Sequence, residues 1–371
     1  MLVETNKIDN EQLNRPLLEV KGLRIEGLSE KGWQEIVRGV NLQLKRGEIL
    51  GLIGESGAGK STIGLAAMGF ARDGCRITAG EIIFDGIELS SAPENEKRKL
   101  RGTRISYVAQ SAAAAFNPAH RLLDQFAEGP VDHGVMSRTK AKEKGRALYR
   151  SLDLPDPENI GERWPHQVSG GQLQRMMVAM AMSCSPDLII FDEPTTALDV
   201  TTQIEVLKTI KEIVTDSNVA ALYITHDLAV VAQLADQLMV LRYGNLVEVN
   251  STGQILEAPK EDYTRALLDA RTRHEKTTAQ FKDSSTLLSI DSVTAGYGKG
   301  PDVLQEVSVS VERGRTVAVV GESGSGKSTL ARVITGLLPP RSGEILFQGE
   351  LLPHALAQRT KQQLRQAQMI Y

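Results

Sequence analysis

The sequence predicts an α/β fold built on a mainly parallel sheet, followed by part of a second copy of that fold. The first observation is that apolar strands alternate with amphipathic helices, which is typical of a parallel sheet covered by helices. The second is a long internal repeat. We expect strands at 18–25, 48–54, 105–109, 187–192, 219–225 and 237–241, and helices at 61–71, 137–152, 170–183 and 201–214.

The early strands differ from the later ones. Residues 18–25 and 40–44 are amphipathic, so we expect a small antiparallel sheet there. The strands before GESGAGKS and before DEP are continuous apolar runs, as expected for strands that are buried on both faces.

The repeat defines the domain organisation. Residues 39–63 return at 306–330, and residues 80–86 return at 343–349. The stretch between the copies is polar and lacks apolar periodicity, which indicates a linker. Because the second copy is much shorter, we expect it to be incomplete. The predicted parts are an N-terminal tail (1–16), a first domain (17–270), a linker (271–286) and the N-terminal part of a second domain (287–371).

Composition excludes several classes of protein. The chain has 371 residues with 43 Lys and Arg against 46 Asp and Glu, a balance that argues against a nucleic-acid coat. No apolar run approaches the ~20 residues of a membrane span, and the polar N-terminus resembles no targeting signal. Two cysteines, Cys75 and Cys184, provide neither a disulfide framework nor a zinc site and suit a reducing, cytoplasmic compartment.

A glycine-rich loop follows the strand at 49–53 and precedes a helix. It fits the pattern GxxxxGK[ST], in which glycines let backbone N–H groups face phosphate oxygens. The helix N-terminus adds partial positive charge. The lysine would reach the β- and γ-phosphates, and the serine hydroxyl would bind Mg²⁺. The candidate ATP-binding residues are Gly54, Glu55, Ser56, Gly57, Ala58, Gly59, Lys60, Ser61 and Thr62.

The same loop recurs in the second copy, and we expect it in the same context, between an apolar strand and a helix. Its serine is a second candidate ligand for Mg²⁺. The alternative, a glycine-rich turn with an incidental lysine, is disfavoured by this recurrence. The residues are Gly321, Glu322, Ser323, Gly324, Ser325, Gly326, Lys327, Ser328 and Thr329.

Two acids end the buried strand 187–192. Asp192 suits the coordination shell of Mg²⁺, and Glu193 can polarise a water molecule. Alone, the pair could equally be solvated loop acids, but a phosphate loop upstream favours the functional interpretation. Gln110 and His226 also follow predicted strands, and either one alone is more often structural.

Ser169, Gly170, Gly171 and Gln172 open a helical run. Ser169 is a good N-cap, and the two glycines leave the N–H groups of the first turn open to an anion. The alternative is an ordinary capped helix.

Taken together, these motifs resemble the ATP-binding subunit of an ABC transporter. The order and spacing of 54–62, Gln110, 168–172, 188–194, 197–199 and His226 carry the resemblance. It covers the first copy almost completely, but the second only through its loop and the strand that follows. Val168 stands where the family usually has Leu.

The resemblance implies roles for single residues. Glu193 would be the general base, while His226 and Gln110 would contact the γ-phosphate; Gln110 and Asp192 would also serve Mg²⁺. Residues 169–172 would contact the nucleotide of an opposing domain, and Asp199 would lie at that interface.

An aromatic ring should stack on adenine. Tyr297 fits that place in the second copy. Trp33 is the nearest candidate in the first, but its spacing is short by about two residues, so a structural tryptophan remains equally open.

Two further segments resemble the oligopeptide, dipeptide and nickel importer branch. One is Ala115–Pro118, similar to its LNP segment; the other is Pro259–Leu268, similar to its P-x-H-P-Y-T-R-x-L tail, with Glu261 and Asp262 in place of His-Pro. Tandem copies in one chain also occur in that branch. Peptides are therefore the leading substrate class.

The resemblance implies ATP and Mg²⁺ as cofactors and two membrane-spanning permease subunits, with a solute-binding protein, as partners. It also implies a peripheral location on the cytoplasmic face of the inner membrane and no nucleic-acid partner. ABC domains would pair face to face, and within this chain only 321–328 and 169–172 could complete one composite site. The alternatives are a soluble tandem ABC ATPase acting on ribosomes or DNA, and an inactive ATP-binding fragment.

Overall fold

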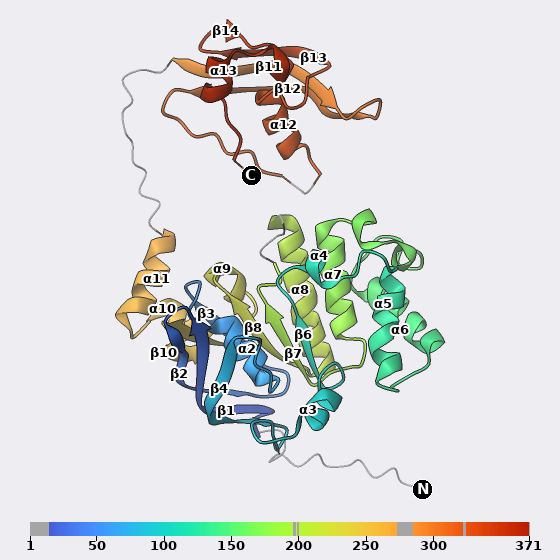
Figure 1. The fold of residues 1–371 in the computed structure, drawn as a ribbon, viewed down its shortest axis with the longest axis vertical. Coiled ribbons are helices and arrows are strands. Elements are labelled where there is room, and N and C mark those ends of the chain that lie inside the picture. Colours follow the sequence, from blue (N-terminus) through green and yellow to red (C-terminus); the bar gives the residue numbers. More distant parts are fainter. Residues whose placement is uncertain (1–14, 196–197, 199, 273–284, 322–323, 371) are drawn as a thin grey trace. The chain divides into compact units, whose positions relative to one another are not determined.

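The computed structural model describes residues 15–195, 198, 200–272, 285–321 and 324–370 (Figure 1). The chain divides into two compact units, Met1–His274 and Glu275–Tyr371. We describe each unit by itself as unit 1 and unit 2. The finer domain limits expected from the sequence stay predictions.

The central sheet of unit 1 has six strands in the order β10-β9-β3-β8-β7-β6. Its β3, β6, β7, β8 and β9 run parallel to their neighbours, while β10 pairs with β9 in the antiparallel sense. The predicted α/β fold with a mainly parallel core is confirmed. The strands are β3 (Ile49–Gly54), β6 (Ile105–Val108), β7 (Leu188–Asp192), β8 (Ala220–Thr225), β9 (Gln237–Arg242) and β10 (Asn245–Ser251).

Apolar layers cover both faces of this sheet. Every residue of β3 is buried. Ile49 and Ile53 belong to one hydrophobic cluster, whereas Leu50 and Leu52 belong to the other. Successive side chains of a strand point to opposite faces, so β3 supplies both layers. This explains why its sequence is a continuous apolar run.

The predicted antiparallel sheet is also present, in the order β2-β1-β4-β5. Leu18, Val20, Leu23 and Ile25 of β1 are buried, and its other residues are partly or fully exposed. The sheet is formed by β1 (Leu18–Ser29), β2 (Gly32–Leu44), β4 (Cys75–Phe84) and β5 (Ile87–Glu88).

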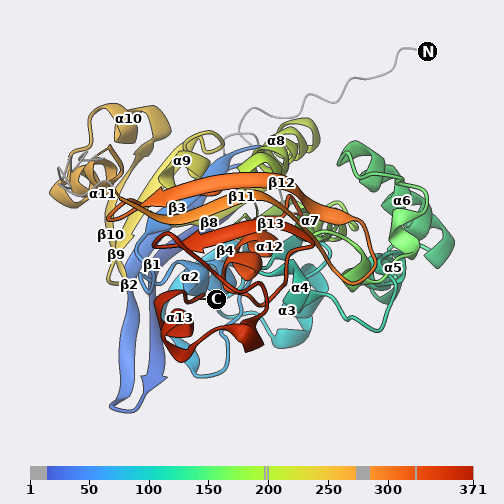
Figure 2. The same ribbon diagram turned by 90° about the horizontal axis from the view of Figure 1, so that it is seen from above.

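A helical subdomain lies on the opposite side of unit 1 from β1 and β2 (Figures 1 and 2). It is formed by α5 (Leu122–Asp132), α6 (Arg138–Ser151) and α7 (Gly170–Ala181), and the rings of Phe126 and Tyr149 meet edge to face at 6.0 Å. No helix within the described ranges is long and apolar enough to cross a bilayer. The remaining helices of unit 1 are α2 (Lys60–Ala67), α3 (Glu94–Leu100), α4 (Ala112–Ala115), α8 (Val200–Ser217), α9 (Leu228–Val231), α10 (Thr252–Glu257) and α11 (Asp262–Thr272), with 3₁₀ turns at Ile160–Glu162 and Pro165–Gln167.

The described residues of unit 2 form an antiparallel sheet in the order β12-β11-β13-β14. A single small apolar cluster, which includes Ile290, Val293 and Ile345, packs between this sheet and α12. The elements are β11 (Thr286–Gly296), β12 (Asp302–Glu312), α12 (Lys327–Ile334), β13 (Ser342–Phe347), β14 (Glu350–Leu351), a 3₁₀ turn at Leu356–Gln358 and α13 (Lys361–Gln366).

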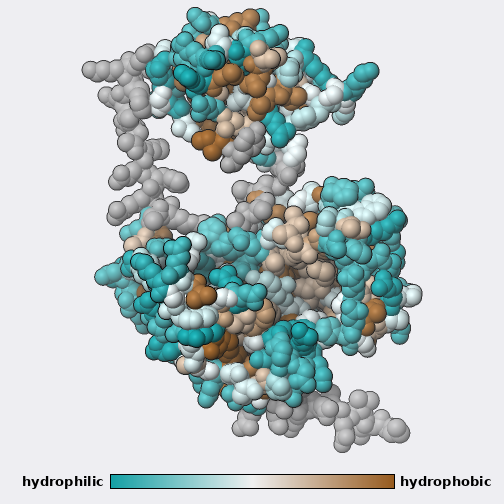
Figure 3. Space-filling model, in the orientation of Figure 1, coloured by the Kyte–Doolittle hydropathy of each residue, from teal (hydrophilic) through white to brown (hydrophobic). Residues whose placement is uncertain are grey.

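One expectation for unit 2 is wrong. Residues 315–320, which precede its phosphate loop, form no strand, although the matching segment of unit 1 is β3. Val319 and Val320 are 50 % and 87 % exposed. A parallel strand needs hydrogen-bonding neighbours, which β8 and β9 provide for β3. No such neighbours occur among the described residues of unit 2, whose visible surface carries hydrophobic patches (Figure 3).

Candidate nucleotide-binding site

The phosphate loop of unit 1 depends on left-handed backbone at two glycines, Gly57 (φ 83°) and Gly59 (φ 94°). A Cβ atom at Gly59 would lie 2.9 Å from the carbonyl oxygen of Ile36 on β2. Glycine is therefore required both for the backbone conformation and for the close approach to β2.

Lys60 begins α2 and is only 5 % exposed. Its Nζ donates hydrogen bonds to the carbonyl oxygens of Gly54 (2.8 Å) and Glu55 (2.9 Å). Burial lowers the pKa of the ammonium group, while the carboxylates of Glu193 and Asp192 act in the opposite direction. The cation is thus held in place by the loop itself.

A cavity of about 410 Å³ opens against this loop. It brings together residues that are far apart in the sequence, namely the loop, Gln110 and Glu193. Its lining consists of Ile36, Ser56, Gly57, Gly59, Lys60, Ser61, Thr62, Arg72, Gln110 and Glu193.

Ser61 and Asp192 meet at the end of β7. The Ser61 hydroxyl donates to Asp192 Oδ1 (2.8 Å), and the hydroxyl of Tyr107 on β6 donates to Asp192 Oδ2 (2.6 Å). A hydroxyl and a carboxylate are oxygen ligands of the kind that Mg²⁺ prefers beside phosphate. The residues present therefore fit a magnesium ion.

Glu193 lies between two polar side chains. It accepts a hydrogen bond from Gln110 Nε2 (3.1 Å), and its other oxygen is 3.1 Å from His226 Nδ1. Its backbone is left-handed (φ 47°), which is uncommon for a residue other than glycine and is typical of functional sites. The three predicted catalytic residues are thus brought together.

The residues 169–172 do not line this cavity. They form the N-terminus of α7, where Ser169 Oγ accepts from Gln172 N and Gln172 Oε1 accepts from Ser169 N. Apart from its chain neighbours and the backbone of its own helix, no atom would lie within 4 Å of a Cβ atom at Gly170, which is exposed. This helix end is therefore open to solvent on the side of Gly170.

The corresponding glycines in the loop of unit 2 are left-handed as well, with φ 88° at Gly324 and 95° at Gly326. Lys327 Nζ donates to Gly321 O (2.7 Å), while Ser328 is exposed. Glu322 and Ser323 lie outside the described residues.

Tyr297 folds onto the helix that follows this loop. Its hydroxyl is 3.3 Å from Thr329 Oγ1 and accepts a hydrogen bond from Arg332 (2.9 Å). Tyr297 is half-exposed.

Trp33 lies on β2, opposite Leu28. The guanidinium of Arg76 covers its ring at 4.2 Å, and Trp33 does not line the cavity. Asp199 lies outside the described residues.

Sequence reasoning missed three residues of the site, Ile36, Arg72 and Tyr107. Ile36 and Arg72 line the cavity, and Tyr107 holds Asp192. Tyr107 carried a weak signal, because it places an aromatic hydroxyl in the strand that ends before Gln110.

A family model described as "ABC transporter" matches residues 37–196 and 304–371, which is more than half of the chain. The chain belongs to the ABC transporter family. Among curated proteins, the glutathione import ATP-binding protein GsiA of Salmonella typhimurium is 34 % identical over 399 residues, covering 96 % of this ABC protein and 64 % of the relative. The GsiA protein of Pectobacterium atrosepticum is also 34 % identical, covering 94 % and 62 %. The chain thus spans less than two thirds of the length of these relatives.

Solved structures give the same fold. The ATP-binding cassette MJ0796 is described as a dimeric structure of a post-hydrolysis state bound to ADP and Pi. Its comparison with this ABC protein gives a TM-score of 0.57 and 24 % identity, and it covers 63 % of this ABC protein and 98 % of the MJ0796 chain. The cbiO1 protein of Clostridium perfringens has a TM-score of 0.55 and 22 % identity, with 65 % and 90 % covered. These two likenesses concern the fold alone.

Proposed function

We propose that the chain binds and hydrolyses ATP as the energising subunit of an ABC importer. The observation that carries this proposal is the position of Glu193. It lines the cavity beside the phosphate loop and contacts both Gln110 and His226. A carboxylate held in this way can accept a proton from water.

In the proposed reaction, the loop 54–61 binds the phosphates of ATP through its N–H groups and Lys60. Glu193 accepts a proton from a water molecule whose oxygen attacks the γ-phosphorus, and the bond to the ADP oxygen breaks. Gln110 and His226 orient the water and the γ-phosphate. Ser61 and Asp192 would hold Mg²⁺, which neutralises charge on the phosphate oxygens when bound.

We further propose that cassettes pair face to face, so that the open helix end at 169–172 of one cassette meets the nucleotide of another. Helix N-termini favour anions, and this one is open at Gly170. ATP binding would close the pair, and hydrolysis would allow it to reopen.

The names of the relatives support a proposal for the substrate class. GsiA proteins are named as glutathione import subunits, and glutathione is a peptide. We propose peptides or related small solutes as cargo, with two permease subunits and a solute-binding protein as partners. The chain would bind peripherally at the cytoplasmic face of the inner membrane.

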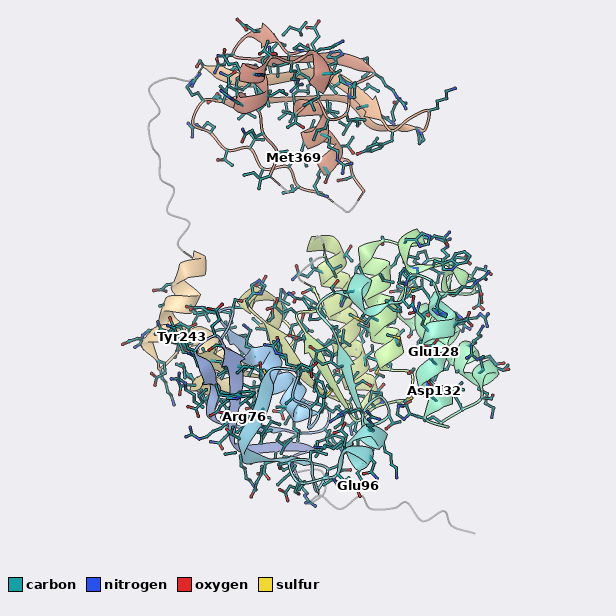
Figure 4. All side chains as sticks on the ribbon, in the orientation of Figure 1. Arg76, Glu96, Glu128, Asp132, Tyr243 and Met369 are labelled. Atoms are coloured by element: carbon teal, nitrogen blue, oxygen red, sulfur yellow. The ribbon has the colours of Figure 1, made fainter. Side chains whose placement is uncertain are left out.

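Glu193→Gln tests the proposed hydrolysis. The amide cannot act as a base, so we expect the ATPase turnover number to fall at least about 100-fold, while the dissociation constant for ATP changes by no more than a few-fold. Glu96→Gln on α3, exposed and labelled in Figure 4, is the matched control. Normal steady-state turnover in Glu193→Gln would remove Glu193 from the role of base.

The partner proposal has its own test. Affinity purification from native membranes should recover multi-span permease proteins in stoichiometric amount. Recovery of ribosomes or DNA in their place would favour a soluble ABC ATPase.

A further inference from the structure

Two cationic side chains line the cavity of unit 1, Lys60 and Arg72. Lys60 already donates to two carbonyl oxygens of the loop. The guanidinium of Arg72 has no hydrogen-bond or ion-pair partner among the residues that the structure describes, and it is exposed.

Neighbouring arginines are engaged. Arg76 is paired with Glu26 and covers Trp33, and Arg101 donates to Glu94 and to two carbonyl oxygens. Arg72 therefore differs from them in lining the cavity beside the phosphate loop without a carboxylate or carbonyl partner among the described residues.

Arg72 lines the same cavity as Gln110 and Glu193. Glu193 contacts Gln110 and His226, so these residues mark the part of the cavity where hydrolysis is proposed.

We propose that Arg72 binds the γ-phosphate of ATP in unit 1 and makes this site favour ATP over ADP. This inference rests on the proposed function, because it assumes that the loop 54–61 binds ATP. A guanidinium presents two parallel N–H donors that match two phosphate oxygens. ADP lacks the γ-phosphate, so only ATP would gain from this contact.

Unit 2 offers an internal contrast. Pro339 lies as many residues after Lys327, the lysine of the second loop, as Arg72 lies after Lys60, so the two positions correspond. The nearby Arg341 is already bound to Asp302 and to the carbonyl oxygens of Gly298 and Gly300. The proposed selectivity therefore belongs to unit 1.

The test measures dissociation constants for ADP and for the β,γ-imido analogue of ATP, both with Mg²⁺, by calorimetric titration. All proteins are the full chain carrying Lys327→Ala, which weakens binding at the second loop. We expect Arg72→Gln to weaken binding of the ATP analogue about tenfold and that of ADP less than about twofold. Arg72→Lys keeps the charge without the planar pair of donors and should be intermediate.

Arg76→Gln is the matched control, because Arg76 (Figure 4) is also exposed and close to Arg72 in the sequence but does not line the cavity. It should bind both nucleotides as the parent does. If Arg72→Gln binds the ATP analogue like the parent, or loses both nucleotides equally, the inference is wrong while the proposed function stands. If the parent itself binds neither nucleotide, both are wrong.

Discussion

The hydroxyl of Tyr107 fixes a carboxylate that the sequence alone would leave free at the end of a strand. It donates to Asp192 at 2.6 Å, and the second carboxylate oxygen accepts from Ser61. Asp192 is therefore positioned before any cation arrives. Groups that orient a metal ligand in this way commonly change metal affinity 10–100-fold when removed.

Tyr107→Phe should therefore raise the Mg²⁺ concentration for half-maximal ATPase activity by about tenfold. A titration with Mg²⁺ at fixed ATP measures this. Tyr243→Phe, exposed and labelled in Figure 4, is the control and should match the parent. An unchanged Mg²⁺ titration in Tyr107→Phe would show that the hydroxyl has no part in positioning Asp192.

At the scale of elements, the same kind of apolar segment has two outcomes in one chain. As β3 it is buried between β8 and β9, and as residues 315–320 it remains exposed without strand pairing among the described residues. A local sequence can specify an extended apolar segment, but a parallel strand also needs neighbours that come from far along the chain.

Exposed apolar segments of high β propensity promote aggregation. Val320→Lys, which adds a charge at an 87 % exposed position, should lower light scattering of the concentrated chain without lowering its melting temperature. Leu351→Lys on β14, 56 % exposed, is the control for an added charge elsewhere in unit 2. Equal improvement in both variants would assign the effect to net charge and not to this segment.

At the scale of the whole molecule, the two units have separate and unequal cores. Unit 1 has apolar layers on both faces of its central sheet, and unit 2 has one small cluster. A small core buries less apolar surface per residue, so unit 2 should be the less stable unit.

Differential scanning calorimetry should therefore show two transitions, with that of unit 2 at the lower temperature. At an ATP concentration near 100 times the dissociation constant, binding adds about 2.7 kcal/mol to the stability of the binding unit. With Mg²⁺, this should raise the upper transition by several degrees. Lys60→Ala should remove that rise, and a rise that persists in Lys60→Ala would place the bound nucleotide outside the first loop.

Much of this organisation could be predicted from the sequence. The order of strands and helices in unit 1 follows from periodicity, and the loop conformation follows from its glycines. What could not be predicted is which strand-terminal side chains meet. Gln110, Glu193 and His226 follow three strands, β6, β7 and β8, that pair as neighbours only in the folded sheet, and Arg72 reaches the cavity from a connecting segment without any motif.

The first glycine of each phosphate loop has almost the same backbone, φ 152° at Gly54 and 151° at Gly321. Their surroundings differ, because a Cβ atom would lie 2.2 Å from the backbone oxygen of Leu241 in unit 1 but 2.9 Å from the side-chain oxygen of Ser325 in unit 2. A backbone oxygen within a sheet cannot move aside, whereas a serine side chain can rotate. Replacing Gly54 by a larger residue would therefore require the backbone to move, whereas at Gly321 a neighbouring side chain could give way. The two positions should therefore tolerate substitution to different degrees, although the two loops are nearly identical in sequence.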